Sequence, residues 1–125
     1  MNEGATIPDV SVAMARGMTS LAGLGAPLVV YFYSKDDTSG CTREAGDFTA
    51  LATDCAAAGV RVVGISKDSP ASHARFAAKH ALTVELASDD SGAACEAFGV
   101  WGEKQMYGRS YMGIERATFL FDRSG

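Results

Sequence analysis

The segment Leu28–Tyr33 constrains the fold more than any other part of the chain. It reads Leu-Val-Val-Tyr-Phe-Tyr, an unbroken β-branched and aromatic run that is typical of a strand buried on both faces. A polar, turn-prone segment follows at 34–40, and from Cys41 onward the apolar spacing becomes helical. Because a strand buried on both faces needs cover on each side of its sheet, we expect a layered α/β domain.

The rest of the chain repeats this alternation of strands and helices. The first helix is expected to bury an apolar stripe and to end near Gly59. Ser69 and Pro70 form an N-cap and a first-turn proline, which together predict that a second helix begins there. We expect an inner sheet that is largely parallel. The stripe consists of Ala45, Phe48, Leu51, Ala52 and Cys55. Strands are predicted at 61–66, 83–87 and 117–122, helices at 70–80 and 91–98, and short strands or turns within 1–27.

Size and charge narrow the class of protein. A chain of 125 residues fits one domain, 1–125. The net charge of −4, with no cluster of Lys and Arg, argues against nucleic acid as a partner. The longest apolar run is too short to cross a membrane, and the first 12 residues lack the pattern of a signal peptide. Three cysteines, an odd number, do not suit a secreted disulfide scaffold. We therefore expect a cytoplasmic enzyme or binding domain.

Cys41 is the residue whose setting points to chemistry. It falls in the first turn of a predicted helix, where unpaired N–H groups and the positive end of the helix dipole stabilise a thiolate. The hydroxyl of Thr38 can point to the same place. The acidic residues at 36–37 oppose thiolate formation, whereas Lys35 and Arg43 favour it. Position alone does not decide the matter, since a lone cysteine at a strand-to-helix turn is more often inert than catalytic.

Longer motifs give the cysteine a context. Residues 31–45, Tyr-Phe-Tyr-Ser-Lys-Asp-Asp-Thr-Ser-Gly-Cys-Thr-Arg-Glu-Ala, strongly resemble the active-site segment of the peroxiredoxin Q group, also called bacterioferritin comigratory proteins. Residues 63–69 and 98–116 match the same group, and the resemblance covers about 20–125. It implies that Trp101, Tyr107 and Tyr111 belong to a long loop that packs near the active site. It implies a thioredoxin-like fold with a central mixed sheet flanked by helices. It also implies a single peroxiredoxin domain that is short at its C-terminus and lacks the family's last strand and helix.

The resemblance also implies an activity. The chain is expected to be a thioredoxin-dependent thiol peroxidase that reduces hydrogen peroxide and small organic hydroperoxides through a sulfenic acid. Carried over by position, the peroxidatic cysteine is Cys41 and the loop threonine that holds the peroxide is Thr38. The distant arginine that stabilises the thiolate and the leaving oxygen is Arg116. Thioredoxin, glutaredoxin or a small thiol is the expected reductant, and no metal, haem, flavin or other cofactor is expected.

Two departures from the family pattern stand out. Ser34 and Ser39 replace prolines of the active-site loop, so the loop is expected to be less preorganised. The positions where relatives carry a resolving cysteine hold Gly46 and, approximately, Ala77. These departures keep a rival interpretation open, in which the chain is a catalytically weakened relative that acts as a structural or interaction domain. The oligomeric state is expected to be a monomer or a weak homodimer.

The two other cysteines are candidates for the resolving role. Cys55 lies 14 residues after Cys41, about 21 Å along an unbroken helix, whereas a disulfide needs Cα atoms within about 7 Å. We expect Cys55 to be a core residue, and Cys95 remains a less favoured resolving partner. Turnover with one cysteine and an external thiol is therefore favoured. His73 and His80, seven residues apart on one helix, are expected to be surface histidines rather than metal ligands.

Overall fold

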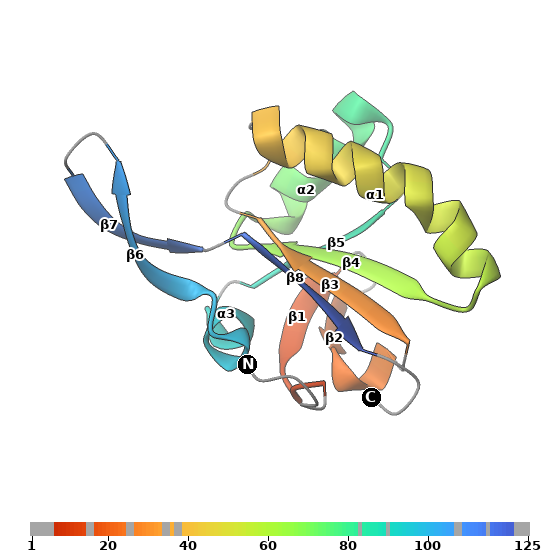
Figure 1. The fold of residues 1–125 in the computed structure, drawn as a ribbon, viewed down its shortest axis with the longest axis horizontal. Helices are drawn as coiled ribbons and strands as arrows, with labels where there is room; N and C mark the ends of the chain where they lie inside the picture. Colours follow the sequence, from red (N-terminus) through yellow and green to blue (C-terminus); the bar gives the residue numbers. More distant parts are fainter. Residues whose placement is uncertain are drawn as a thin grey trace.

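The computed structural model describes residues 7–14, 17–24, 27–33, 36, 39–82, 84–89, 91–106, 109–114 and 116–121. Strands and helices alternate along most of this length, as the sequence predicts (Figure 1). In chain order the elements are β1 (Ser11–Met14), β2 (Gly17–Ser20), a 3-10 turn (Ala22–Leu24), β3 (Leu28–Phe32), α1 (Ser39–Ala57), β4 (Arg61–Ser66), α2 (Pro70–His80), β5 (Glu85–Ser88), α3 (Ala93–Phe98), β6 (Trp101–Met106), β7 (Arg109–Ile114) and β8 (Ala117–Phe121).

The main sheet is mixed. In the described part of the chain its strand order is β2-β1-β5-β4-β3-β8. The three inner strands β3, β4 and β5 are parallel, whereas β8 and β1 flank them in the antiparallel direction. The parallel strands are connected through α1 and α2, which both lie over the same face of the sheet (Figure 1). Because parallel strands need a crossover helix, this βαβαβ unit follows from the alternation seen in the sequence.

The predicted start and end signals of the helices are present. The Ser69 hydroxyl accepts a hydrogen bond from the backbone N–H of Ser72 at 3.1 Å, and Pro70 is the first residue of α2. The chain leaves α1 after Ala57, and Gly59 has a φ of +79°, a left-handed conformation that glycine adopts without strain.

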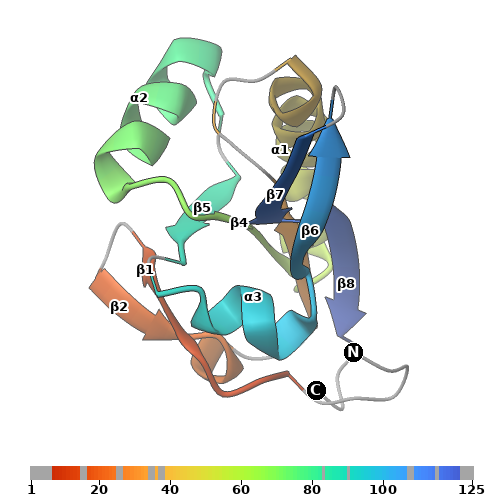
Figure 2. The same cartoon turned by 90° about the vertical axis from the view of Figure 1, so that its left-hand side faces the viewer.

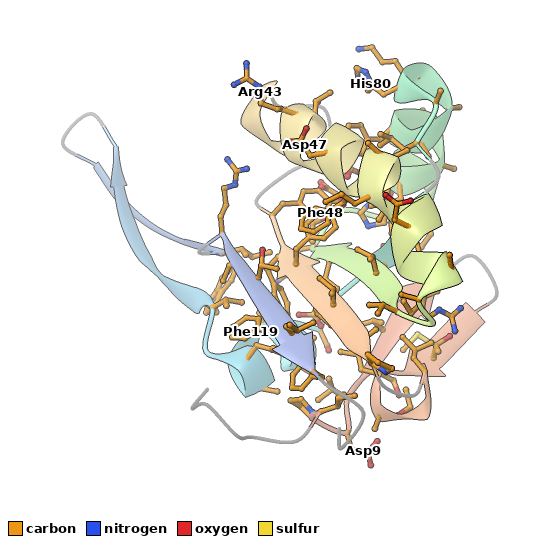
Figure 3. The ribbon with its side chains drawn as sticks, turned by 45° about the vertical axis from the view of Figure 1, so that its right-hand side comes forward. Asp9, Arg43, Asp47, Phe48, His80 and Phe119 are labelled. Atoms are coloured by element: carbon orange, nitrogen blue, oxygen red, sulfur yellow. The ribbon has the colours of Figure 1, made fainter. Side chains whose placement is uncertain are left out.

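Side chains of β3 alternate between two apolar layers. Figure 2 shows α3 on the side of the sheet away from α1 and α2. Val30 and Phe32 face the layer that contains α3, where the ring centroids of Phe32 and Phe98 lie 4.9 Å apart. Tyr31 and Tyr33 face α1 and α2. Figure 3 shows Phe48 between α1 and the sheet, where its ring stacks on Tyr31 at 4.3 Å. Both faces of β3 are therefore buried, as its continuous apolar sequence predicts.

Three details differ from the sequence-based expectation. Leu51 is 52% exposed, because at 100° per residue it lies about 120° around α1 from the buried Ala45. The segment after α3 is not a loop: β6 and β7 pair as an antiparallel hairpin that projects from the body of the domain (Figure 1). α1 also begins at Ser39, two residues before Cys41.

Within the described residues, no helix is long and apolar enough to cross a membrane.

Candidate active site

The candidate site lies where the chain passes from β3 to α1. Cys41 is the third residue of α1, so its backbone occupies the first helical turn. At that position the N–H groups have no partner within the helix, and the positive end of the helix dipole favours an anion. The side chain of Cys41 and all of Thr38 lie outside the described residues. Arg43, on the same turn, is exposed and points away from the sheet (Figure 3).

Arg116 reaches the same end of the sheet from a distant part of the chain. It is exposed and directly precedes β8. Since Ala117 pairs with Phe32, the last residue of β3, the backbone of Arg116 lies beside the point where the chain leaves for α1. The antiparallel pairing of β8 with β3 therefore brings the backbone of Arg116 to the end of the sheet from which the chain enters α1 and reaches Cys41.

Asp36, between β3 and α1, is the best-connected polar residue of the site. The residue is only 8% exposed. Its Oδ1 accepts a hydrogen bond from the Tyr33 hydroxyl at 2.5 Å, and its Oδ2 accepts one from the Ser72 hydroxyl at 2.7 Å. The Nδ1 atom of His73 lies 2.8 Å from Oδ2 and 3.0 Å from Oδ1. Residue 36 is thus fixed by contacts to Tyr33, which directly follows β3, and to α2.

The histidine in this cluster contradicts its predicted surface position. His73 is only 5% exposed, and its Nε2 lies 3.0 Å from the backbone oxygen of Ala87 in β5. His80, seven residues later, is partly exposed and packs edge-on against Phe76 at 5.5 Å. Buried His73 needs a polar partner, and that partner is 37 residues away in the sequence. Among the described residues no group of His, Cys, Asp or Glu is arranged to hold a metal ion.

The hydrogen bonds set the charge state of the cluster. Burial by itself raises the pKa of the Asp36 carboxyl, but the hydrogen bonds from His73, Tyr33 and Ser72 outweigh burial and leave that pKa below its ordinary value. Burial and the neighbouring carboxylate raise the pKa of Tyr33 far above its ordinary value, so the phenol stays neutral and donates. Asp36 is therefore an ionised carboxylate, and the hydrogen bonds from its own partners stabilise its negative charge.

Cys95 lies on the other side of the sheet from α1. It is fully buried in the apolar layer that contains Phe32 and Phe98. Its backbone N–H donates to Asp89 at 2.8 Å. Burial and then the hydrogen bond and charge of Asp89 raise the pKa of the Cys95 thiol to about 12. This setting is that of an unreactive core thiol.

Cys55 is separated from Cys41 by continuous helix. α1 runs unbroken from Ser39 to Ala57, so the two backbones are about 21 Å apart along its axis, as the sequence predicts. The side chain of Cys55 lies outside the described residues. In this fold the backbone of Cys55 and the side chain of Cys95 both lie away from the start of α1.

The strand order and the crossover helices, with a cysteine in the first turn after an inner strand, place the domain in the thioredoxin-like class of folds. The profile of the AhpC/TSA family matches residues 4–125, and the chain belongs to this family. It is 44% identical to peroxiredoxin Bcp of Xanthomonas campestris pv. campestris over 119 aligned residues, and the alignment covers 94% of this chain and 74% of the relative. Peroxiredoxin Bcp of Bacillus subtilis is 41% identical over 98% of this chain and 79% of the relative.

The fold agrees with these sequence relationships. The solved structure of the X. campestris bacterioferritin comigratory protein superimposes with a TM-score of 0.87 at 40% identity, covering 99% of this chain and 83% of that one. The predicted resemblance to the peroxiredoxin Q group and the thioredoxin-like mixed α/β fold are thereby confirmed. The chain is a peroxiredoxin of the Bcp group, and thus a thiol peroxidase.

Proposed function

We propose that this peroxiredoxin reduces hydrogen peroxide and small organic hydroperoxides through Cys41. The observation that carries the proposal is the position of Cys41 in the first turn of α1, where the helix favours a thiolate. In support, the X. campestris structure was studied for alkyl peroxide reduction. The thiolate attacks one peroxide oxygen and the O–O bond breaks. One oxygen stays on sulfur as a sulfenic acid, and the other leaves as water or an alcohol after taking a proton.

Two further residues are assigned to this step. Thr38, three residues before Cys41, hydrogen-bonds the peroxide and holds it in line with the thiolate. Arg116 supplies a permanent positive charge that stabilises both the thiolate and the leaving oxygen. Support for Arg116 comes from the pairing of Ala117 with Phe32, which carries its backbone to the same edge of the sheet.

Resolution of the sulfenic acid is proposed to use an external thiol. That thiol attacks the sulfur of Cys41, expels water and forms a mixed disulfide. A second thiol then attacks the mixed disulfide, which releases Cys41 as a thiol and the two external thiols as a disulfide. Supporting this one-cysteine route, Cys95 is a buried thiol on the opposite face of the sheet, and Cys55 is separated by continuous helix. Thioredoxin, glutaredoxin and small thiols are the proposed reductants. A cytoplasmic location and a monomeric or weakly dimeric single domain complete the proposal.

Peroxide consumption with dithiothreitol tests this function. We expect the wild-type protein, Cys55→Ser and Cys95→Ser to consume hydrogen peroxide, and Cys41→Ser to lose the activity, each variant being checked for a native circular dichroism spectrum. Arg116→Met should react at least about tenfold more slowly. An inactive wild-type protein would instead favour a weakened relative with a structural role, and an active Cys41→Ser would remove Cys41 from the reaction.

A further inference from the structure

A buried polar cluster joins the loop before Cys41 to the rest of the domain. Its centre is the Asp36 carboxylate, which lies in that loop, and its partners come from three other places in the fold. Tyr33 follows β3, Ser72 and His73 belong to the first turns of α2, and His73 in turn contacts the Ala87 carbonyl of β5. The peroxide reaction described above assigns no role to this cluster.

The chemistry of the partners determines where the protons lie. The Ala87 carbonyl only accepts, so the Nε2 atom of His73 carries a proton and donates at 3.0 Å. The Nδ1 atom of His73 faces both oxygens of the Asp36 carboxyl, and this hydrogen bond helps to hold the pKa of Asp36 below its ordinary value. The hydroxyls of Tyr33 and Ser72 donate to one oxygen each. Three side-chain donors therefore converge on a single carboxylate, which fixes both the position and the plane of the group.

The backbone of the same residue is also held. The N–H group of Asp36 donates to Oδ2 of Asp68 at 2.7 Å, and the hydroxyl of Ser66 donates to the same oxygen at 2.9 Å. Beyond these contacts, the cations Arg75 and Lys79 line a pocket of about 300 Å³ beside Asp36. Residue 36 is thus tied at its main chain and at its side chain, two positions before Thr38 and five before Cys41.

We propose that Asp36 and His73 are positioning residues for peroxide reduction, because together they fix the loop that carries Thr38 and leads into Cys41. This proposal rests on the proposed function of Cys41. A residue two positions along the chain lies at most about 7 Å away, so an anchor at residue 36 limits where Thr38 can place its hydroxyl. Holding the peroxide in line is the step that such an anchor serves.

The structure offers a matched pair of variants at His73. An asparagine amide nitrogen can replace Nδ1 and keep a donor toward Asp36 while losing the contact with the Ala87 carbonyl. A glutamine amide nitrogen can replace Nε2 and keep the contact with Ala87 while losing the donor toward Asp36. Both substitutions place an amide in the same buried site. They therefore differ mainly in whether the contact with Asp36 or the contact with the Ala87 carbonyl is kept.

The decisive measurement compares two reactions of Cys41 at a temperature where all variants are folded. We expect His73→Gln to react with hydrogen peroxide at least about tenfold more slowly than wild type, and His73→Asn to stay within about threefold. Alkylation of Cys41 by iodoacetamide, which needs no positioned peroxide, should change less than about threefold in both. Equal peroxide rates in the two variants, or a parallel loss of alkylation and peroxide rates, would overturn the proposal.

A second pair serves if the histidine variants do not fold. Ser72→Ala removes a donor to Asp36 but keeps the cap of α2, whereas Ser69→Ala removes the cap and leaves the donors of Asp36 in place. We expect only Ser72→Ala to slow the peroxide reaction, by about threefold or more. Equal rates in these two variants would also refute the positioning role. A wild-type protein without Cys41-dependent peroxide reduction would instead refute the proposed function itself.

Discussion

Gly64, in the middle of β4, leaves room for an aromatic ring on the neighbouring strand. A Cβ atom built at this position falls within 2.9 Å of three atoms at the far end of Tyr31, namely Cε1, Cζ and the hydroxyl oxygen. Tyr31 is fully buried and its ring stacks on Phe48 of α1. A methyl group at residue 64 therefore displaces the ring, and the ring pushes on the helix that carries Cys41.

The size of the effect follows from this packing. Gly64 does not have a positive φ, so alanine can adopt its backbone conformation and the cost comes from the side chain. Overpacking a buried site costs about 1–3 kcal/mol. With an unfolding entropy of about 2.1 cal/mol/K per residue, a loss of about 2 kcal/mol lowers the melting temperature of 125 residues by about 8 °C.

A second glycine provides the control. A Cβ atom at Gly46, on the exposed side of α1, meets nothing within 4 Å. Gly46→Ala should therefore stabilise the protein by about 0.5–1 kcal/mol through helix propensity. Thermal melting followed by circular dichroism should shift in opposite directions for Gly64→Ala and Gly46→Ala. If Gly64→Ala melts at or above the wild-type temperature, the ring does not occupy the space that the glycine leaves.

Two other predictions concern titrating groups. Cys95 is fully buried and its thiol pKa is raised to about 12, so it should resist iodoacetamide at pH 8 in the folded protein and react only after denaturation. Rapid labelling of Cys95 in the native protein, seen by peptide mass spectrometry, would contradict this. Folding lowers the pKa of Asp36 below its value of about 3.9 in the unfolded chain, so the ionised carboxylate stabilises the folded protein at pH values above about 3.9. This stabilisation is lost as the pH falls through the lower pKa of the folded state. Urea unfolding at pH 6, 4 and 3 should therefore show the stability gap between wild type and Asp36→Asn narrowing in acid, whereas a constant gap would mean that the Asp36 pKa is not lowered.

Much of the fold is predictable because its signals are local. The apolar run of β3 and the Ser69–Pro70 start of α2 lie within a few residues of the elements they define. The predicted β4, Arg61–Ser66, matches the structure residue for residue. The position of Cys41 in the first turn of α1 follows from the same kind of signal, the change from strand to helical spacing.

The features that sequence reasoning missed depend on distant partners. The polar partner of His73 cannot be read from nearby sequence, because Asp36 lies in a loop 37 residues away. A usable signal was present, since His73 and Phe76 are three residues apart on α2 and share its buried face. The family resemblance implies a loop where the structure has the β6–β7 hairpin, and the residues of these strands lack the clear alternation of polar and apolar side chains that would predict a hairpin. Thr38 lies outside the described residues, so its role stays a prediction.

The pairing of β8 with β3 has a consequence for the order in which the molecule assembles. Its partners, from Phe32 with Ala117 to Leu28 with Phe121, are 85–93 residues apart, whereas β3 and β4 pair across 33 residues. Closing the longer span costs more chain entropy, so the unit from β3 to β5 is expected to form first during synthesis. Arg116 then arrives only when β8 docks. If Arg116 activates Cys41 as proposed, a chain still emerging from the ribosome has a thiol that only the start of α1 activates, and its full sensitivity to oxidants begins when β8 docks.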